Sequence, residues 1–296
     1  MVDAAPRVAL VVKRTAYARA LDLPDDRLHA LLEKGDPTVA NVIASHEEHT
    51  ATVNEVKQAL VEVGAEVTRI RKTSFPADDF DLVVTVGGDG TLLRASHSVG
   101  VAPVLGVNSA PSSSVGFFCG AETHTAAAAI QAALAGKIAV VELGRMQVSV
   151  NGEVVHARVL NDALFCHQSP AATSRYILKY GSTEEEHKSS GFWVGPAAGS
   201  TAAQRSAGGA VLPLSSKQLQ LVVREPYTPT GDPPRLVRVL AKNNTTITVR
   251  AKSRQMRLFL DGPDTIVRIG LGDVIEFTQS PEPLRLLGIA NRKKWS

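Results

Sequence analysis

The first 137 residues alternate short apolar runs with stretches of helical spacing. Four runs are of the kind that form strands buried on both faces of a parallel sheet: residues 8–12, 67–70, 81–86 and 104–107. A helical insert is expected after the first run, followed by a helix over residues 46–63 that ends at Gly64. The alternation predicts an α/β domain with a doubly wound, Rossmann-like sheet, which binds ligands beyond the carboxyl ends of its strands.

The pattern changes near residue 138. After an alanine-rich helix expected over residues 123–135, helical spacing mostly disappears. Two strand-like runs, residues 146–150 and 154–160, flank Asn-Gly, which is a strong hairpin signal. Further strand-like runs follow at 175–180, 219–224, 245–250, 256–260, 265–269 and 274–278. This second pattern predicts an antiparallel, β-sandwich-like domain.

The length of the chain also favours two domains. Single cores usually stop growing near ~250 residues, and this chain has 296. We expect an α/β domain over residues 1–137 and an antiparallel β domain over residues 138–280. The C-terminal tail, residues 281–296, is expected to return to the first domain.

Composition narrows the class of protein further. Hydrophobic residues make up 44% and charged residues 21%, which is typical of a folded globular chain and excludes disorder or a fibre. The 32 basic and 29 acidic residues predict a surface of mixed charge, which does not by itself indicate nucleic-acid binding. No apolar run approaches the ~18 residues of a membrane span, and no signal peptide is recognised. Two cysteines without a paired spacing fit a reducing compartment, so we expect a cytoplasmic protein.

A glycine-rich loop directly follows the third strand-like run and precedes a helix expected over residues 91–99. Residues 87–91 read Gly-Gly-Asp-Gly-Thr. Glycines let a phosphate approach the backbone, and a helix start attracts anions. The glycines alone are equally compatible with a tight turn capped by Thr91. Asp89 favours phosphoryl transfer, because a carboxylate beside a phosphate needs a metal to hold or a proton to accept. Neither the common P-loop sequence nor Gly-x-Gly-x-x-Gly is present in the strand-to-helix turns.

Two further loops are candidates for binding. Residues 195–209 are rich in glycine and serine, and Thr201 and Gln204 have the spacing of a capping box. Such a loop is commonly a helix start, but its small side chains would let an adenine or ribose lie against the backbone. Asn161 and Asp162 follow a strand end, where an amide beside a carboxylate binds hydroxyl groups or forms a turn.

A histidine pair invites a metal interpretation. His46 and His49 flank two glutamates, but a zinc-protease helix needs histidines four residues apart, and these are three apart. We therefore expect this segment to be the solvated start of a helix.

The three loops together, in this order and spacing, resemble the NAD kinase family, as does Asp261-Gly262 near the end of the chain. The resemblance runs from the first strand to about residue 280. Residues 107–116 and 188–191 are similar to the branch that includes mitochondrial NAD kinases. Three positions depart from common family patterns: Asp162 replaces a glutamate, Ser190 replaces an aspartate, and Ala203 replaces a tyrosine that packs against the dinucleotide.

The resemblance implies an ATP-dependent kinase that phosphorylates the 2′-hydroxyl of the adenosine ribose of NAD and gives NADP. Asp89 would accept the hydroxyl proton as the catalytic base. Mg²⁺ would enter with the ATP phosphates, and Asp89 is a second candidate ligand for it. The implied ATP-binding positions are Gly87, Gly88, Gly90 and Thr91. The implied NAD-binding positions are Asp89, Gly90, Asn161, Asp162, Ser190, Thr201, Ala202, Ala203, Gln204, Arg205 and Ser206.

Family habit further implies a homodimer or homotetramer, without a nucleic-acid or membrane partner. Two alternatives stay open. One is a lipid kinase of the diacylglycerol or sphingosine type, whose loop and domain plan are related, although its downstream Gly-Thr-Gly-Asn-Asp stretch is absent. The other is a dinucleotide sensor that has lost the chemistry.

Overall fold

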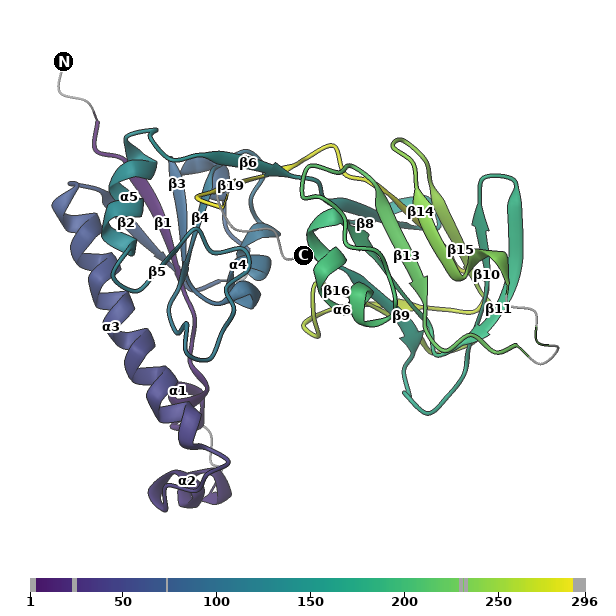
Figure 1. Cartoon of the computed structure of the whole chain (residues 1–296), viewed down its shortest axis with the longest axis horizontal. Helices are drawn as coiled ribbons and strands as arrows, with labels where there is room; N and C mark the ends of the chain where they lie inside the picture. The colour runs from purple at the N-terminus through teal and green to yellow at the C-terminus, as the bar shows by residue number, and fades with distance from the viewer. Residues whose placement is uncertain (1–3, 23–25, 73, 229–230, 232–233, 290–296) are drawn as a thin grey trace. The chain divides into compact units, whose positions relative to one another are not determined.

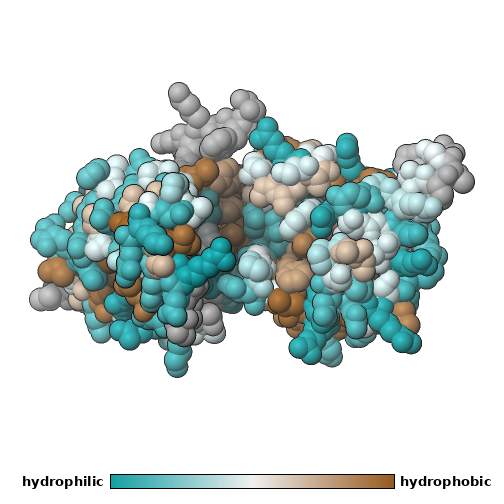
Figure 2. Space-filling view, turned by 90° about the horizontal axis from the view of Figure 1, so that it is seen from below, coloured by the Kyte–Doolittle hydropathy of each residue, from teal (hydrophilic) through white to brown (hydrophobic). Residues whose placement is uncertain are grey.

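The computed structural model describes residues 4–22, 26–72, 74–228, 231 and 234–289 (Figure 1). The chain divides into two compact units. One holds the chain up to Val141 together with the stretch from Leu284 onward, and the other is Glu142–Pro283. No helix in the described residues is long and apolar enough to cross a membrane. Hydrophilic residues cover most of each unit on the face shown in Figure 2, as expected from the balanced charge.

The first unit is built on a mainly parallel sheet. Its strands are β1 (Arg7–Val12), β2 (Glu66–Ile70), β3 (Leu82–Gly87), β4 (Val104–Asn108), β5 (Ala121–Glu122), β6 (Val140–Leu143) and β19 (Leu284–Leu287), in the order β2-β1-β3-β4-β19-β6, with β5 also on β4. β1, β3 and β4 are buried as their apolar runs predict, whereas the edge strand β2 is mostly exposed. The return of the chain to this sheet through β19 extends it beyond β4.

Helices cover both faces of this sheet. They are α1 (Ala16–Ala20), α2 (Asp26–Glu33), α3 (Ala40–Glu62), the 3-10 turn η1 (Ala77–Asp79), α4 (Asp89–Ser96) and α5 (Ala126–Leu134). α3 and α5 pack against each other, and Figure 1 shows α4 on the other side of the sheet. The apolar positions Val53, Val56 and Leu60 of α3 are buried against the sheet. The helical insert after β1 and the helix end at Gly64, where φ is +67°, are confirmed.

The start of α3 differs from the prediction. The helix begins at Ala40 rather than residue 46, so His46 and His49 lie within it and not at its start. Alanine and other residues compatible with a helix fill the extra turn, and the cap residue Val39 makes no side-chain bond that marks the boundary. The helix start was misplaced because the capping signal that sequence analysis relies on is absent.

The second unit is a sandwich of two six-stranded antiparallel sheets, ordered β11-β10-β15-β18-β7-β8 and β14-β13-β12-β9-β16-β17. The strands are β7 (Met146–Val150), β8 (Glu153–Val159), β9 (Ala163–His167), β10 (Ser174–Tyr180), β11 (Thr183–Ser189), β12 (Phe192–Pro196), β13 (Leu219–Val223), β14 (Arg238–Ala241), β15 (Ile247–Ala251), β16 (Met256–Leu260), β17 (Thr265–Ile269) and β18 (Val274–Gln279). Short helical turns are η2 (Ala197–Thr201), α6 (Ala203–Ser206) and η3 (Arg235–Val237). The Asn151-Gly152 hairpin is confirmed, with positive φ at both residues.

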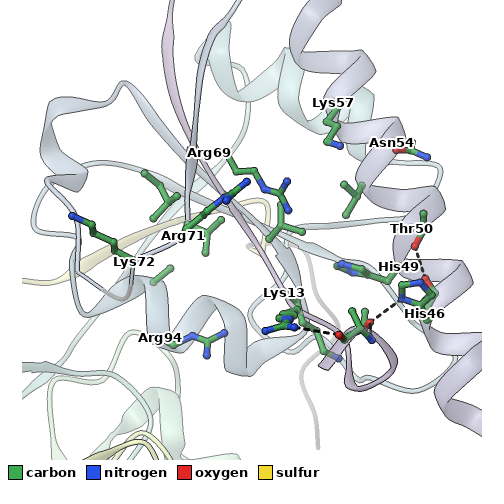
Figure 3. Close-up of a pocket in the computed structure, with 18 of the residues that line it drawn as sticks. Lys13, His46, His49, Thr50, Asn54, Lys57, Arg69, Arg71, Lys72 and Arg94 are labelled. Atoms are coloured by element: carbon green, nitrogen blue, oxygen red, sulfur yellow. Dashed lines mark hydrogen bonds between the residues drawn. The ribbon is translucent and has the colours of Figure 1, made fainter. Parts of the chain in front are cut away.

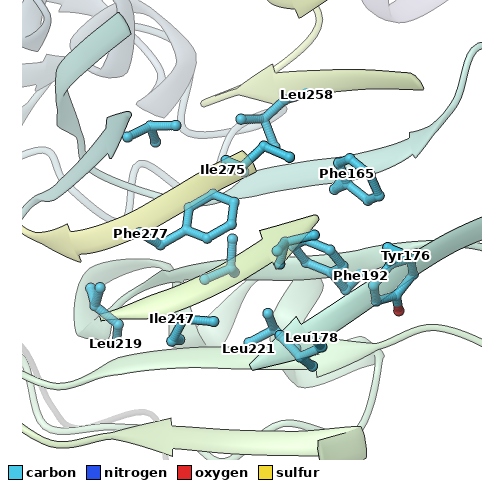
Figure 4. Packing of buried hydrophobic residues seen from close by; sticks show 14 of the residues in the cluster. Phe165, Tyr176, Leu178, Phe192, Leu219, Leu221, Ile247, Leu258, Ile275 and Phe277 are labelled. Carbon is cyan, nitrogen blue, oxygen red and sulfur yellow. The ribbon is translucent and has the colours of Figure 1, made fainter. Parts of the chain in front are cut away.

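Aromatic side chains join the two sheets of this sandwich (Figure 4). Phe192 from one sheet packs edge-on against Tyr176 and Phe277 of the other, with ring centroids 5.2 and 5.9 Å away. Phe165 stacks on Phe192 at 4.9 Å. Such pairs stabilise a core by about 0.5–1.5 kcal/mol beyond the area they bury. They give the second unit a rigid frame for the loops that its strands carry.

Candidate active site

Residues 87–91, which we call the phosphate loop, connect β3 to α4. Gly87 ends the strand, Gly88 is the helix cap, and Asp89 is the first helical residue. The expected cap at Thr91 is therefore wrong: Thr91 lies in the first turn, and its amide donates to the carbonyl of Gly88 at 3.0 Å. The earlier start is stabilised because the carboxylate of Asp89 carries negative charge at the positive end of the helix dipole.

The three glycines of the phosphate loop serve different purposes. A side chain at Gly87 would collide with Thr91, and one at Gly88 would collide with the hydroxyl of Ser114. Gly90 has open space where its side chain would be. None of the three has a positive φ. Gly87 and Gly88 are thus required by close packing, and Gly90 keeps the start of the helix accessible.

Asp89 holds a neighbouring segment in place. Its two carboxylate oxygens accept backbone hydrogen bonds from Phe117 and Phe118, each at 2.8 Å. The same segment is tied to the end of β4, because the side-chain amide of Asn108 donates to the carbonyl of Ser114 at 2.8 Å. A carboxylate has about four lone-pair sites, so Asp89 retains the capacity to accept a further proton.

A cavity of about 730 Å³ lies beside the phosphate loop, within the first unit (Figure 3). We call it the cationic pocket. Its Lys and Arg side chains come from the ends of β1 and β2, from α3 and from α4: Lys13, Arg14, Lys57, Arg69, Arg71, Lys72 and Arg94. No Asp or Glu is among the described residues that line it. Lys13 links it to the loop, since its amide donates to the carbonyl of Val86 at 2.8 Å.

Sequence analysis missed this pocket, although the sequence contains a signal for it. Lys13 and Arg14 directly follow β1, and Arg71 and Lys72 directly follow β2. The carboxyl ends of neighbouring parallel strands meet at one edge of a sheet, so these two pairs of charged residues are expected to lie close together. The near-neutral total charge concealed a local excess of positive charge.

The two histidines are not the solvated helix start that the sequence predicts. His49 is 6% exposed, and its Nδ1 lies 2.7 Å from the hydroxyl of Ser109. Burial and the charge of Lys13 lower the pKa of His49 to about 4. His46 Nδ1 lies 2.8 Å from the hydroxyl of Thr15. No group of His, Cys, Asp or Glu among the described residues has the arrangement of a metal site, so a histidine metal centre finds no support.

The other two predicted loops come together in the second unit. The backbone amides of Leu160, Asn161 and Asp162 all donate to the carboxylate of Asp261, at 2.8, 2.7 and 3.0 Å. The amide of Asp261 returns a 2.8 Å bond to the carbonyl of Asp162. We call residues 160–162 with Asp261 and the loop of residues 195–206 the nucleotide cluster. Asp261 entered the sequence analysis only through the family resemblance, and its capping role was not expected.

Glycine permits the two loops to touch. Side chains at Gly195 and Gly199 would both collide with the carbonyl of Asn161, and one at Gly195 would also lie 3.0 Å from the Cα of Asp162. Gln204 adds to this contact. It is fully buried, its side-chain amide approaches the carbonyl of Asn161 at 3.5 Å, and it accepts a 3.0 Å hydrogen bond from Gln220. The side chain of Gln204 therefore positions Asn161 in this structure.

Asp162 has an unusual environment for a carboxyl group. It is 5% exposed and accepts a 2.9 Å bond from the side-chain amide of Asn161. Burial and the nearby charge of Asp261 raise its pKa to about 7. Near neutral pH, both protonation states of Asp162 are populated.

The remaining predicted positions lie around this cluster. Ser190 is half-buried between β11 and β12, and its amide donates to the carbonyl of Arg224 at 3.1 Å. Thr201, Ala202 and Ala203 are half-buried, and Arg205 and Ser206 are exposed. The expected capping box is wrong, because α6 begins after Ala202 without a side-chain cap. Gln204 cannot reach back to a cap while it is committed to the buried bonds described above.

The fold and these two regions define a class of protein: an α/β unit with a phosphate loop joined to a β-sandwich. Solved kinases share this fold. The crystal structure of an NAD kinase from Archaeoglobus fulgidus in complex with ATP has a TM-score of 0.68 and 21% identity, covering 95% of this chain and 92% of that chain. Yeast NADH kinase complexed with NADH has a TM-score of 0.71 and 14% identity, covering 98% and 90%.

Sequence relationships assign the family. The model of the ATP-NAD kinase N-terminal domain matches residues 8–138. A probable NADH kinase of Oryza sativa subsp. japonica is 34% identical over 281 residues, covering 86% of each chain. NADH kinase of Arabidopsis thaliana is 35% identical over 236 residues, covering 72% of this chain and 74% of the relative. An NAD kinase of Geobacter sp. is 29% identical over 283 residues, covering 91% and 88%. The chain belongs to the NAD kinase family, which favours neither the lipid kinase nor the inactive sensor.

Proposed function

We propose that this protein transfers the γ-phosphoryl group of ATP to the 2′-hydroxyl of the adenosine ribose of NAD and so makes NADP. The observation that carries this proposal is Asp89: a carboxylate at the start of α4, between two glycines and beside a pocket of Lys and Arg side chains. Phosphoryl transfer depends mainly on positioning and charge neutralisation. The first unit contains candidate residues for both positioning and charge neutralisation.

The donor is proposed to occupy the cationic pocket, with its terminal phosphates at the phosphate loop. The open side of Gly90 and the positive end of the α4 helix dipole suit a phosphate oxygen. The described residues offer no protein cage for a metal ion, so Mg²⁺ would be held by the phosphates themselves, with Asp89 as a candidate protein ligand. When bound there, it would neutralise charge on the transferred phosphoryl group.

The acceptor is proposed to use the nucleotide cluster. Asn161 and Asp162 together present amide donors and a carboxylate to a ribose or an adenine edge. The small side chains of Thr201, Ala202 and Ala203 leave the backbone open to the dinucleotide, with Ser190, Arg205 and Ser206 at the margin. Asp89 is proposed to accept the proton of the 2′-hydroxyl as that oxygen attacks the γ-phosphorus.

We propose that NADH is a phosphoryl acceptor in addition to NAD. The observation in favour is that the rice and Arabidopsis relatives, at 34% and 35% identity, are a probable NADH kinase and an NADH kinase. Purified protein with ATP and Mg²⁺ is incubated with NAD or with NADH, and the phosphorylated product is measured by a coupled NADP-specific dehydrogenase. We expect product from both. Absence of product from NAD would contradict the proposed kinase function, and absence of product from NADH alone would contradict only the proposal that NADH is an acceptor.

Two broader properties are proposed on the family resemblance. The protein is expected to be a homodimer or homotetramer, which light scattering after size-exclusion chromatography measures. It is expected to act in the cytoplasm, where its two free cysteines, Cys119 and Cys166, would stay reduced.

A further inference from the structure

The cationic pocket carries more positive charge than the magnesium complex of ATP needs. Its described lining brings seven Lys and Arg side chains to one cavity of about 730 Å³. Arg14 forms an ion pair with Asp22, and six further cations line the described part of the pocket: Lys13, Lys57, Arg69, Arg71, Lys72 and Arg94. Free ATP carries about four negative charges near neutral pH, and its magnesium complex carries about two. The charge of the pocket matches the free anion better.

The carboxylate of the phosphate loop is held by a neighbouring segment. Both oxygens of Asp89 accept amides of the segment at Phe117 and Phe118. Asp89 is also absent from the described lining of the pocket. A phosphate chain entering the pocket therefore meets cations, and no Asp or Glu among the described lining residues opposes it.

His49 reports the field inside the pocket. This imidazole lines the cavity, and the charge of Lys13 adds to burial in lowering its pKa. His46, whose Nδ1 is bonded to Thr15, adds a smaller effect in the same direction. Burial is the larger cause of this shift, and the contribution from the charge of Lys13 reflects a positive potential that favours an anion in the same space.

We propose that the cationic pocket binds the phosphate chain of the donor as the free anion, so that a divalent cation is needed for phosphoryl transfer but not for donor binding. This inference rests on the proposed function in taking ATP as the ligand. Losing Mg²⁺ restores two negative charges to ATP, and each is attracted by the six cations. We expect ATP to bind about three- to tenfold more tightly in EDTA than in excess Mg²⁺ at low ionic strength.

The test is calorimetric titration of the full chain with ATP and with inorganic tripolyphosphate, each in EDTA and in excess Mg²⁺. The double variant Arg71→Gln/Lys72→Gln removes two exposed charges of the pocket, so the fold should be retained. It should weaken ATP binding in EDTA about tenfold. The matched control, Lys137→Gln/Arg268→Gln, removes one exposed Lys and one exposed Arg outside the pocket and should leave binding unchanged.

Each outcome decides the question. Binding in EDTA that is at least as tight as in Mg²⁺, and that the pocket variant alone weakens, supports the inference. Binding only in Mg²⁺, or equal weakening by the control, overturns it. NADP formation assayed on the same preparation separates failure of this inference from failure of the proposed function. If the protein makes NADP but binds ATP only with Mg²⁺, the inference is wrong and the proposed function stands.

Discussion

The two candidate binding regions are built by opposite means. The cationic pocket consists of long, charged side chains at strand ends and on helices, several of them exposed. The nucleotide cluster consists of buried backbone contacts, in which two glycines and one carboxylate hold a strand end against a loop. The first region is suited to attract a ligand by charge and the second to recognise one by shape.

This difference sets how each region responds to change. A flexible cation on a surface contributes modestly, is screened by salt and is partly replaced by its neighbours. A glycine packed against a carbonyl has no such freedom, since protein interiors leave few voids for an added methyl group. We therefore expect graded effects of substitution in the cationic pocket and large single-site effects in the nucleotide cluster and phosphate loop.

The largest effect is expected at Asp89, a charged side chain bound by backbone amides. Asp89→Asn removes the proposed base, and its NH₂ group would face one of the two amide donors, so one hydrogen bond is lost as well. We expect kcat to fall by about 10²–10⁴-fold and the free energy of unfolding by about 1–2 kcal/mol. Steady-state kinetics and thermal unfolding measure the two effects. Near wild-type kcat would remove Asp89 from the mechanism.

Gly199→Ala should cause the next largest loss. The added methyl group would collide with the carbonyl of Asn161 and force the two loops of the nucleotide cluster apart. We expect kcat/KM for NAD to fall by about 10²-fold, with ATP binding in EDTA unchanged. Gly144→Ala is the matched control, since its methyl group would meet only the carbonyl of Ser216, at 3.7 Å. Equal losses in both variants would show that the effect is not local to the cluster.

Salt should distinguish the two regions in the unmodified protein. Raising the ionic strength from about 0.05 to 0.5 M shortens the screening length from about 14 to 4 Å. We expect KM for ATP to rise several-fold, because the cationic pocket acts through charge, and KM for NAD to change by less than about twofold. Kinetics at constant pH in a non-binding salt measure both values. A larger change for NAD than for ATP would reverse the assignment of donor and acceptor to these regions.

The sequence predicted those parts of the fold that local patterns encode. Buried strands β1, β3 and β4 are continuous apolar runs, and the sandwich strands β16 and β17 match their predicted bounds. β11 and β12 were not predicted. β11 is an edge strand with three consecutive glutamates, and β12 ends in glycine and proline, which are poor strand formers. Their places are fixed by pairing with distant strands.

The candidate site was predictable only in part for the same reason. The phosphate loop and residues 161 and 162 stand out as local motifs. The cap formed by Asp261 depends on contacts with residues about 100 positions away in sequence. The approach of Gly199 to Asn161 joins residues 38 positions apart. The cationic pocket gathers residues 13 to 94, whose charges have no pattern until the parallel sheet aligns its strand ends. Whether the predicted positions contact NAD stays a prediction.

The last expected effects are opposite pH responses of His49 in the first unit and Asp162 in the second. The pKa of His49 is lowered to about 4 from 6.5, so folding loses stability as pH falls from about 6.5 towards 4, while the unfolded chain takes up the proton. His187, whose pKa is also lowered by burial, adds to this acid limb from the second unit. The pKa of Asp162 is raised to about 7 from 3.8, so its contribution is complete below 3.8 and is lost as pH rises through 7.

Thermal unfolding of wild type, His49→Gln and Asp162→Asn from pH 4 to 8.5 should separate these limbs. Asp162→Asn should remove a decline of about 1–4 kcal/mol that develops between pH 4 and 7, and His49→Gln should shallow the acid limb without abolishing it, because His187 remains. Deprotonation of Asp162 near pH 7 also turns a donor into an acceptor for ribose hydroxyls. KM for NAD should therefore change between pH 6 and 8 in wild type and stay flat in Asp162→Asn, whereas KM for ATP should be unaffected by that variant; a flat wild-type profile would show that the carboxyl of Asp162 does not contact the acceptor.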